Sequence, residues 1–144
     1  MELVAFYKKY YASHPLLKNF QDWLMKGGEV GRFSLSGLQT SSRALFLAAA
    51  FEQSDKTFIV VSDNDEEGVY FYNDLKKVLT ETYFFPTTKK NDVSTTILRT
   101  EVLDRLVTNK RMFVVTTMDA LQESVPDKKT LLCCCIKART ISTW

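Results

Sequence analysis

Apolar residues recur with a helical period over the first 28 positions of this chain. The segment Glu2–Ala12 and the segment that starts at Pro15 both carry apolar residues three and four positions apart, which predicts two helices. Pro15 suits a first helical position, because its missing N–H needs no partner there. We interpret His14, the preceding residue, as a capping or surface residue rather than a general base. Gly27 and Gly28 are expected to end the second helix, since glycine readily adopts the left-handed conformation.

Beyond residue 28, short apolar runs alternate with amphipathic stretches. The runs predicted as strands are Val30–Leu35, Thr57–Val61, Tyr83–Phe85 and Arg111–Thr116. Helices are predicted at Arg43–Phe51, at the stretch that contains Phe71, Leu75, Val78 and Leu79, around Leu98, Val102 and Leu106, and at Met118–Ser124. The polar segment Thr87–Thr96 is expected to be a surface loop. This alternation predicts the α/β class, with a parallel sheet and helices on both of its faces.

Composition narrows the class of protein. The 144 residues suit one domain, and 19 basic against 17 acidic residues give a net charge of +2. This balance excludes a polybasic nucleic-acid arm but permits a local basic patch. The three consecutive cysteines, Cys133–Cys135, match neither a disulfide framework nor zinc-ligand spacing, so we expect reduced thiols. No apolar run approaches the roughly 20 residues of a membrane helix, and we expect a cytoplasmic protein without a membrane partner.

The segment Gly37–Ala44 lies between a predicted strand and a predicted helix, where a phosphate-binding loop would stand. In the working motif, glycines let backbone N–H groups surround the phosphates, a lysine reaches the β- and γ-phosphates, and a hydroxyl holds magnesium. Here Ser42 replaces the second glycine, Arg43 the lysine and Ala44 the hydroxyl. Two interpretations stay open for Gly37, Ser41, Ser42, Arg43 and Ala44. They form either a serine-rich turn that caps a helix, or a degenerate phosphate loop that retains anion binding at a helix N-terminus.

The sequence contains no clear motif for a catalytic site or a metal site. The acidic cluster Asp63, Asp65, Glu66 and Glu67 follows a predicted strand, but carboxylates are favourable at a helix N-terminus, and Asn64 with Glu67 resembles a capping box. The last strand ends without a paired Asp–Glu, and no G-x-S-x-G signature is present. We therefore expect no catalytic residue, no metal and no cofactor.

The most basic region surrounds Lys89 and Lys90 and continues into the following predicted helix with Arg99. A solvated loop and helix face is one interpretation. The other is a surface that contacts nucleic-acid phosphates, which positions nucleic acid without reading its sequence. Lys89, Lys90 and Arg99 are the candidate DNA contacts.

Ordered short motifs over residues 15–125 resemble one known family. They are Leu35–Ala49 around the altered phosphate loop, Phe58–Glu67 followed by Tyr70–Leu75, Phe84–Pro86, Ile97–Leu106 and Phe113–Leu121. Together they resemble the N-terminal part of the bacterial transcription-repair coupling factor, most closely in its Bacteroidetes versions. Thr40, where a glycine is expected, departs from the family pattern.

This resemblance implies a fold and a role. It implies the first subdomain of a UvrB-like module, with a RecA-like shape and a degenerate nucleotide site, which acts as a non-catalytic scaffold. The whole factor would be an ATP-dependent DNA translocase that displaces stalled RNA polymerase and recruits UvrA in nucleotide excision repair. The fragment's partners would be the factor's other subdomains, with UvrA and RNA polymerase reached through the full-length protein and only weak DNA contact. The alternative is a small P-loop ATPase or helicase fragment with an unusual phosphate loop.

Three segments follow from these observations. Residues 1–28 are expected to form a helical segment that packs on the domain, and residues 29–125 the UvrB-like α/β subdomain. Residues 126–144 resemble nothing in the family. We interpret them as an atypical tail, produced by truncation or a frameshift.

Overall fold

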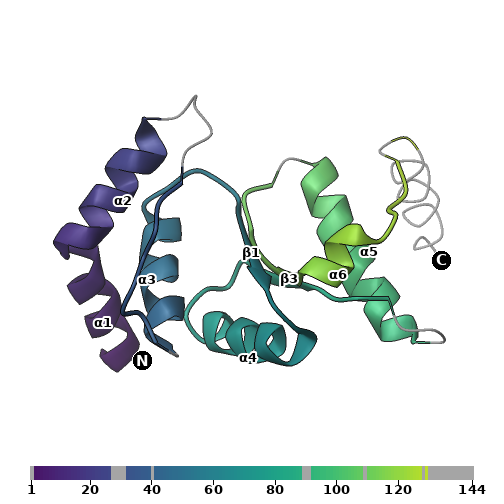
Figure 1. Cartoon of the computed structure of the whole chain (residues 1–144), viewed down its shortest axis with the longest axis horizontal. Helices are drawn as coiled ribbons and strands as arrows, with labels where there is room; N and C mark the ends of the chain where they lie inside the picture. The colour runs from purple at the N-terminus through teal and green to yellow at the C-terminus, as the bar shows by residue number, and fades with distance from the viewer. Residues whose placement is uncertain are drawn as a thin grey trace, which may run out of the picture. The chain divides into compact units, whose positions relative to one another are not determined.

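The computed structural model describes residues 2–26, 32–39, 41–88, 92–108, 110–127 and 129, and the chain divides into two compact units. The helical unit comprises Met1–Lys56 and Asn73–Thr80, and the sheet unit comprises Thr57–Tyr72 and Glu81–Trp144. Figure 1 shows their elements in chain order. The predicted segment 1–28 falls within the helical unit, whereas the predicted subdomain 29–125 contributes residues to both units. Most of the predicted tail, 126–144, lies outside the described residues.

Three helices dominate the helical unit: α1 (Glu2–Ala12), α2 (Pro15–Met25) and α3 (Ser41–Glu52). Helix α3 is buried along much of its length, at Ala44, Phe46, Ala48, Ala49, Ala50 and Phe51. Its small alanine side chains let neighbouring helices approach closely. Helix α1 packs on α3 through an ion pair of 2.6 Å between Lys8 Nζ and Glu52 Oε1, and α2 does so through the rings of Phe20 and Phe46, 5.9 Å apart.

The expected start of α2 is confirmed, but the strand predicted after it is wrong over its described residues. His14 caps α2, since its Nδ1 accepts a hydrogen bond of 3.2 Å from the Leu16 N–H. Residues 32–35 form no strand, and Val30 lies outside the described residues. Instead the Phe33 ring packs against the rings of Phe20, at 5.4 Å, and Trp23, at 5.7 Å. The apolar residue Phe33 therefore packs against helix α2 and does not form part of a sheet.

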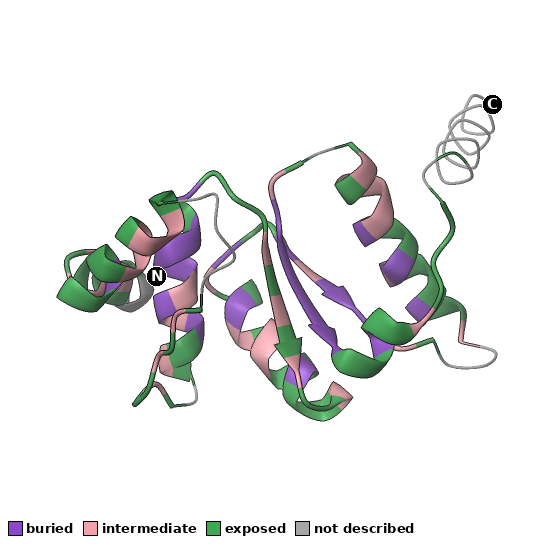
Figure 2. Cartoon of the chain, turned by 45° about the horizontal axis from the view of Figure 1, so that its top comes forward, coloured by how far each residue is buried: buried purple, intermediate pink, exposed green. Residues whose placement is uncertain are grey.

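The sheet unit contains three parallel strands: β1 (Phe58–Ser62), β2 (Thr82–Phe85) and β3 (Phe113–Thr117). Their spatial order is β1-β3-β2, with Phe113 opposite both Phe58 and Thr82. The central strand β3 is buried at all five positions, as Figure 2 shows, because it is paired on both edges and covered on both faces. These three predicted strands, and the parallel α/β class, are confirmed.

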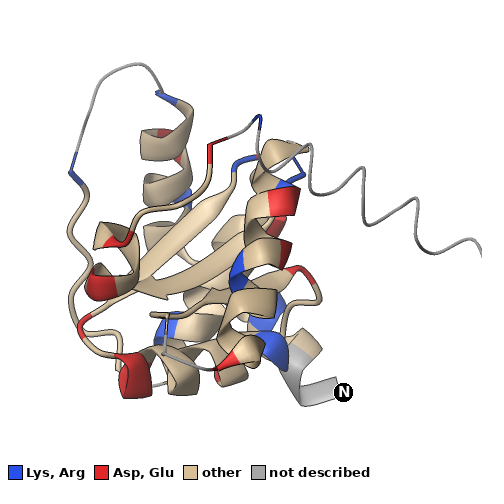
Figure 3. Ribbon diagram, turned by 90° about the vertical axis from the view of Figure 1, so that its right-hand side faces the viewer, with Lys and Arg blue, Asp and Glu red and all other residues tan. Residues whose placement is uncertain are grey.

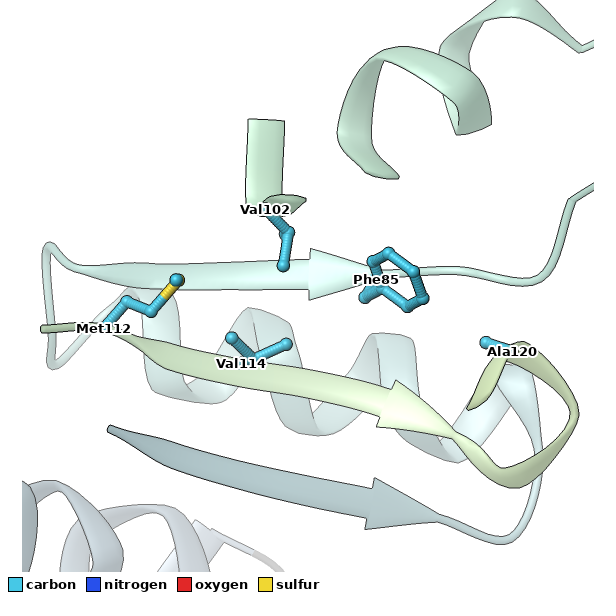
Figure 4. Packing of buried hydrophobic residues seen from close by; sticks show 5 residues of the cluster. All are labelled: Phe85, Val102, Met112, Val114 and Ala120. Carbon is cyan, nitrogen blue, oxygen red and sulfur yellow. The ribbon is translucent and has the colours of Figure 1, made fainter. Parts of the chain in front are cut away.

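Helices cover both faces of this sheet. On one face, α5 (Val93–Val107) contributes Val102 to a core cluster with Phe85, Met112, Val114 and Ala120, shown in Figure 4. On the other face lies α4 (Asp65–Lys76), whose Tyr72 ring is 5.6 Å from the ring of Phe84. Gly68 lets α4 approach closely, because a Cβ there would lie 3.3 Å from Ser62 Oγ.

Two helix starts in the sheet unit are fixed by capping side chains. The loop predicted over Thr87–Thr96 is wrong for its last four residues, since α5 begins at Val93. Asp92 Oδ1 accepts a hydrogen bond of 2.9 Å from the Ser94 N–H, and this cap outweighs the polar composition that predicted a loop. The short helix α6 (Met118–Gln122) begins after Thr117, whose hydroxyl accepts a hydrogen bond from the Ala120 N–H. Among the described residues, no helix is long and apolar enough to cross a membrane.

Candidate functional site

The segment predicted as a phosphate loop closes on itself and leads into α3. Gly37 adopts a φ of +83°, in the left-handed region that favours glycine. Ser42 closes the next turn: its hydroxyl donates to the Gln39 carbonyl at 2.6 Å, and its oxygen accepts from the Gln39 N–H at 2.9 Å. Thr40 lies outside the described residues. The described residues of this segment therefore form a turn at the start of α3 in which Ser42 bonds to the backbone of Gln39.

The surroundings of this turn disfavour a phosphate group. The Ser41 hydroxyl donates a hydrogen bond of 2.9 Å to Asp74 Oδ2, which places a carboxylate at the first residue of α3. A carboxylate there competes with any other anion for the positive end of the helix dipole. Ala44 is buried, and its methyl group cannot hold magnesium, while Arg43 is exposed. The structure thus brings Ser41, Ser42, Arg43 and Ala44 together in the first turn of α3, with the Asp74 carboxylate bonded to Ser41.

A second polar cluster lies where the three parallel strands end. Asp65 Oδ1 is 3.2 Å from Thr87 Oγ1 and 3.3 Å from Thr117 Oγ1, and the two hydroxyl oxygens are 3.3 Å apart. Asp65 follows β1, Thr87 follows β2 and Thr117 ends β3. Ligands of open α/β sheets bind outside these carboxyl ends. Here the side chains hydrogen-bond to one another, so the cluster ties the three strand ends together.

Arg99 belongs to a third cluster, which lies beside β2. Its Nη1 donates to the Pro86 carbonyl at 2.8 Å and lies 3.0 Å from Glu123 Oε2, and its guanidinium carbon stands 4.1 Å over the Phe85 ring. Arg99 is buried, whereas a phosphate contact needs a surface position. Its charge is neutralised inside the fold by Glu123. The other candidate DNA contacts, Lys89 and Lys90, lie outside the described residues.

Glu123 is the acceptor at the centre of this cluster. Its carboxylate accepts hydrogen bonds from the Thr88 hydroxyl, at 2.6 Å, and from the Thr88 N–H, at 2.9 and 3.1 Å. The Thr88 hydroxyl contributes most to holding the pKa of Glu123 below its ordinary value of 4.5, with further lowering from the Thr88 N–H and the Arg99 charge against an opposing effect of burial. The charged form of Glu123 thus stabilises the fold.

This lowered pKa predicts a loss of stability in acid. A carboxylate with a depressed pKa contributes stability above its ordinary pKa of 4.5, and the contribution is lost as the pH falls through the lowered value. We expect the free energy of unfolding, measured by urea denaturation between about pH 6 and about pH 3, to fall more steeply for the native chain than for Glu123→Gln. Equal slopes for the two proteins would contradict the assignment.

Three of the acidic residues after β1 lie in the first turn of a helix, where the sequence predicted a helix start. Asn64 Oδ1 accepts a hydrogen bond of 2.8 Å from the Glu67 N–H, and Asp65, Glu66 and Glu67 occupy the first turn of α4. In the part of the chain that the structure describes, no group of three or more His, Cys, Asp or Glu side chains is placed to hold a metal ion. Cys133–Cys135 lie outside it.

Sequence reasoning missed the threonines and Glu123. The available signal was the position of Thr87 and Thr88 directly after β2, and of Thr117 at the end of β3. Carboxyl ends of parallel strands meet at one edge of a sheet, so polar residues that follow such strands are brought together. The pairing of Arg99 with Glu123 had no local signal, because 24 positions separate them along the chain.

Comparisons of the chain with protein-family models, with curated proteins and with solved structures find no match. The functional interpretation therefore depends on the geometry above and on the resemblance in the sequence.

Proposed function

We propose that this chain is a non-catalytic scaffold domain, of the kind that begins the UvrB-like module of a bacterial transcription-repair coupling factor. In this proposal the domain has a RecA-like ancestry and acts in the cytoplasm. Its partners are the other subdomains of the factor, and the full-length protein carries the translocase activity and the contacts with UvrA and RNA polymerase. The parallel α/β sheet with helices on both faces is compatible with such a fold.

The observation that carries the proposal is the state of the phosphate-loop position. A working loop presents backbone N–H groups, a lysine and a hydroxyl to the nucleotide. Here a carboxylate, Asp74, accepts a hydrogen bond from Ser41 at the helix start, and Ser42 bonds to its own turn. The buried methyl group of Ala44 stands at the magnesium position. These side chains stabilise a helix start, which is the role that remains when a nucleotide site has been lost.

The strand ends support the same proposal. In α/β enzymes the reactive groups come from the carboxyl ends of the strands. In this chain Asp65 bonds to Thr87 and Thr117, and Arg99 is paired with Glu123. These groups hold strands, helices and connecting segments together through hydrogen bonds and an ion pair within the fold.

Thermal melting with Mg-ATP separates the scaffold from the alternative, a P-loop ATPase or helicase fragment. A ligand at 100 times its dissociation constant would stabilise the folded state by about 2.7 kcal/mol, which raises the melting temperature by several degrees. We expect no rise with millimolar Mg-ATP relative to magnesium alone. A reproducible rise of several degrees, absent when sodium phosphate replaces ATP, would overturn the proposal in favour of the alternative.

The parent protein is tested by the genomic DNA that follows the Asp127 codon, translated in all three frames. The proposal predicts that one frame continues with the rest of the UvrB-like module and a translocase motor. Three frames that lack both would refute the assignment to a coupling factor and leave the non-catalytic fold as a separate result.

A further inference from the structure

Among the described residues, no backbone group pairs with the outer edge of β1. The Phe58 N–H donates to the Met112 carbonyl at 3.1 Å, so Phe58 and the alternate residues after it direct their backbone groups toward β3. The N–H and C=O groups of Ile59 and Val61 therefore point to the opposite side. Among the described strands, β1 pairs with β3 alone. Within the described part of the chain, two donors and two acceptors thus stand in a row along one edge without a strand partner.

The side chains of the same two residues are apolar and exposed. Ile59 is 54% exposed and Val61 is 43% exposed, although both lie within a strand. The core cluster on their face of the sheet contains residues of β2, β3, α5 and α6 and Met112, which precedes β3, but no residue of β1. Natural edge strands are usually protected by a lysine, a proline or a bulge. The β1 sequence, Phe-Ile-Val-Val-Ser, contains none of these residues.

Negative charge surrounds the carboxyl end of this edge. Asp63 and Glu66, which follow β1, and Asp119, which follows β3, are exposed carboxylates. Figure 3 shows acidic residues gathered near the edge where the strands end. Such a field attracts a basic group and repels nucleic-acid phosphates. An occupant of the β1 edge therefore combines an apolar extended segment with positive charge at one end.

We propose that β1 is a docking edge for an extended segment of a partner protein, which adds to the sheet as a fourth strand. Main-chain hydrogen bonds to Ile59 and Val61 supply affinity, and alternate apolar side chains of the partner pack on the exposed side chains of these residues. A lysine or arginine at the end of the segment lies beside Asp63. The proposal rests on the sheet unit alone and is independent of the repair role proposed above.

A labelled peptide of alternating valine and threonine with two lysines at one end is the probe. One version, with the lysines at its N-terminus, tests antiparallel addition, and the other, with the lysines at its C-terminus, tests parallel addition. Fluorescence anisotropy measures binding of each version to the full chain. We expect saturable binding of one version. The same peptide, N-methylated at the two amides that would face β1, is expected to bind at least about fivefold more weakly, because two hydrogen bonds of about 0.5–1.5 kcal/mol each are lost. This comparison leaves the protein unchanged.

Two protein variants locate the site. Ile59→Pro removes an N–H that points away from β3, so we expect the fold, monitored by circular dichroism, to persist and peptide binding to be lost. Asp63→Asn with Asp119→Asn is expected to weaken binding severalfold and to flatten its dependence on salt.

Three outcomes would overturn the proposal. They are absence of saturable binding for both peptides at millimolar concentration, equal binding of the N-methylated peptide, and a dimer of the chain in sedimentation that Ile59→Pro disrupts. The last outcome would show that a second copy occupies the edge.

Discussion

Replacing Phe113 by alanine is expected to lower the free energy of unfolding by about 3–5 kcal/mol. Phe113 is fully buried in the central strand β3, its ring lies 5.7 Å from the ring of Phe58, and its backbone is paired with both neighbouring strands. Truncation removes the buried ring and leaves a cavity. Strand β3 cannot move to fill this cavity, because both of its edges are paired with neighbouring strands. Urea denaturation followed by circular dichroism measures the loss.

Phe6→Ala is the matched control for this prediction. Phe6 is 64% exposed on α1, so the same chemical change removes little buried surface there. We expect a loss below about 1 kcal/mol, as for most surface substitutions. Similar losses for the two variants would contradict the placement of Phe113 in the core of the sheet unit.

Replacing Arg99 by alanine is expected to cost about 2–4 kcal/mol, because the change removes a buried side chain together with its ion pair and its hydrogen bond to a buried carbonyl. The variant also leaves the Pro86 carbonyl without its donor and uncovers the face of the Phe85 ring. The Glu123 carboxylate keeps Thr88 but loses its opposite charge. The free energy of unfolding in urea at neutral pH measures the effect.

Arg105→Ala on the same helix is the control for Arg99. Arg105 Nε lies 3.7 Å from Glu101 Oε1 in an i,i+4 pair, and its guanidinium carbon stands 4.3 Å over the Tyr83 ring. It therefore offers the same two kinds of contact at a more exposed position, where such a pair contributes up to about 1 kcal/mol. A loss for Arg99→Ala no larger than that for Arg105→Ala would show that the burial of Arg99 adds nothing to its pairing.

The apolar pattern predicted correctly those helices and strands that neighbouring residues in the sequence are enough to specify. The β-branched runs that contain β1 and β3 are dense enough to be strands in any context, and Pro15 with His14 marks the start of α2 without reference to the rest of the fold. The class of fold followed from their alternation.

Two predictions, the strand that contains Phe33 and the loop that contains Asp92, were wrong because interactions with other residues decided the local structure. Phe33 gives its segment a strand-like pattern, but its ring packs on Phe20 and Trp23 of α2. Asp92 extends α5 into a polar stretch by capping it. In both places one long-range packing contact or one capping hydrogen bond decided the structure.

The candidate site was only partly visible in the sequence. The departure of this segment from the phosphate-loop motif could be read from Arg43 and Ala44, because the motif specifies residue types at fixed spacing. The carboxylate that accepts the Ser41 hydrogen bond, Asp74, lies 33 positions from Ser41 in the chain. Likewise, Arg99 is of a residue type that often contacts phosphate, and its partner Glu123, which follows α6, is brought to it only by the tertiary fold.

Steady-state ATP hydrolysis is the most direct test of the central claim that this fold is a scaffold without nucleotide chemistry. The assay uses the full chain with millimolar Mg-ATP, with and without duplex DNA, beside Arg43→Ala, which changes the exposed cation at the phosphate-loop position. We predict no turnover above the protein-free background in either protein, with or without DNA. Turnover by the native chain that Arg43→Ala abolishes would contradict the claim and identify a working nucleotide site at the start of α3.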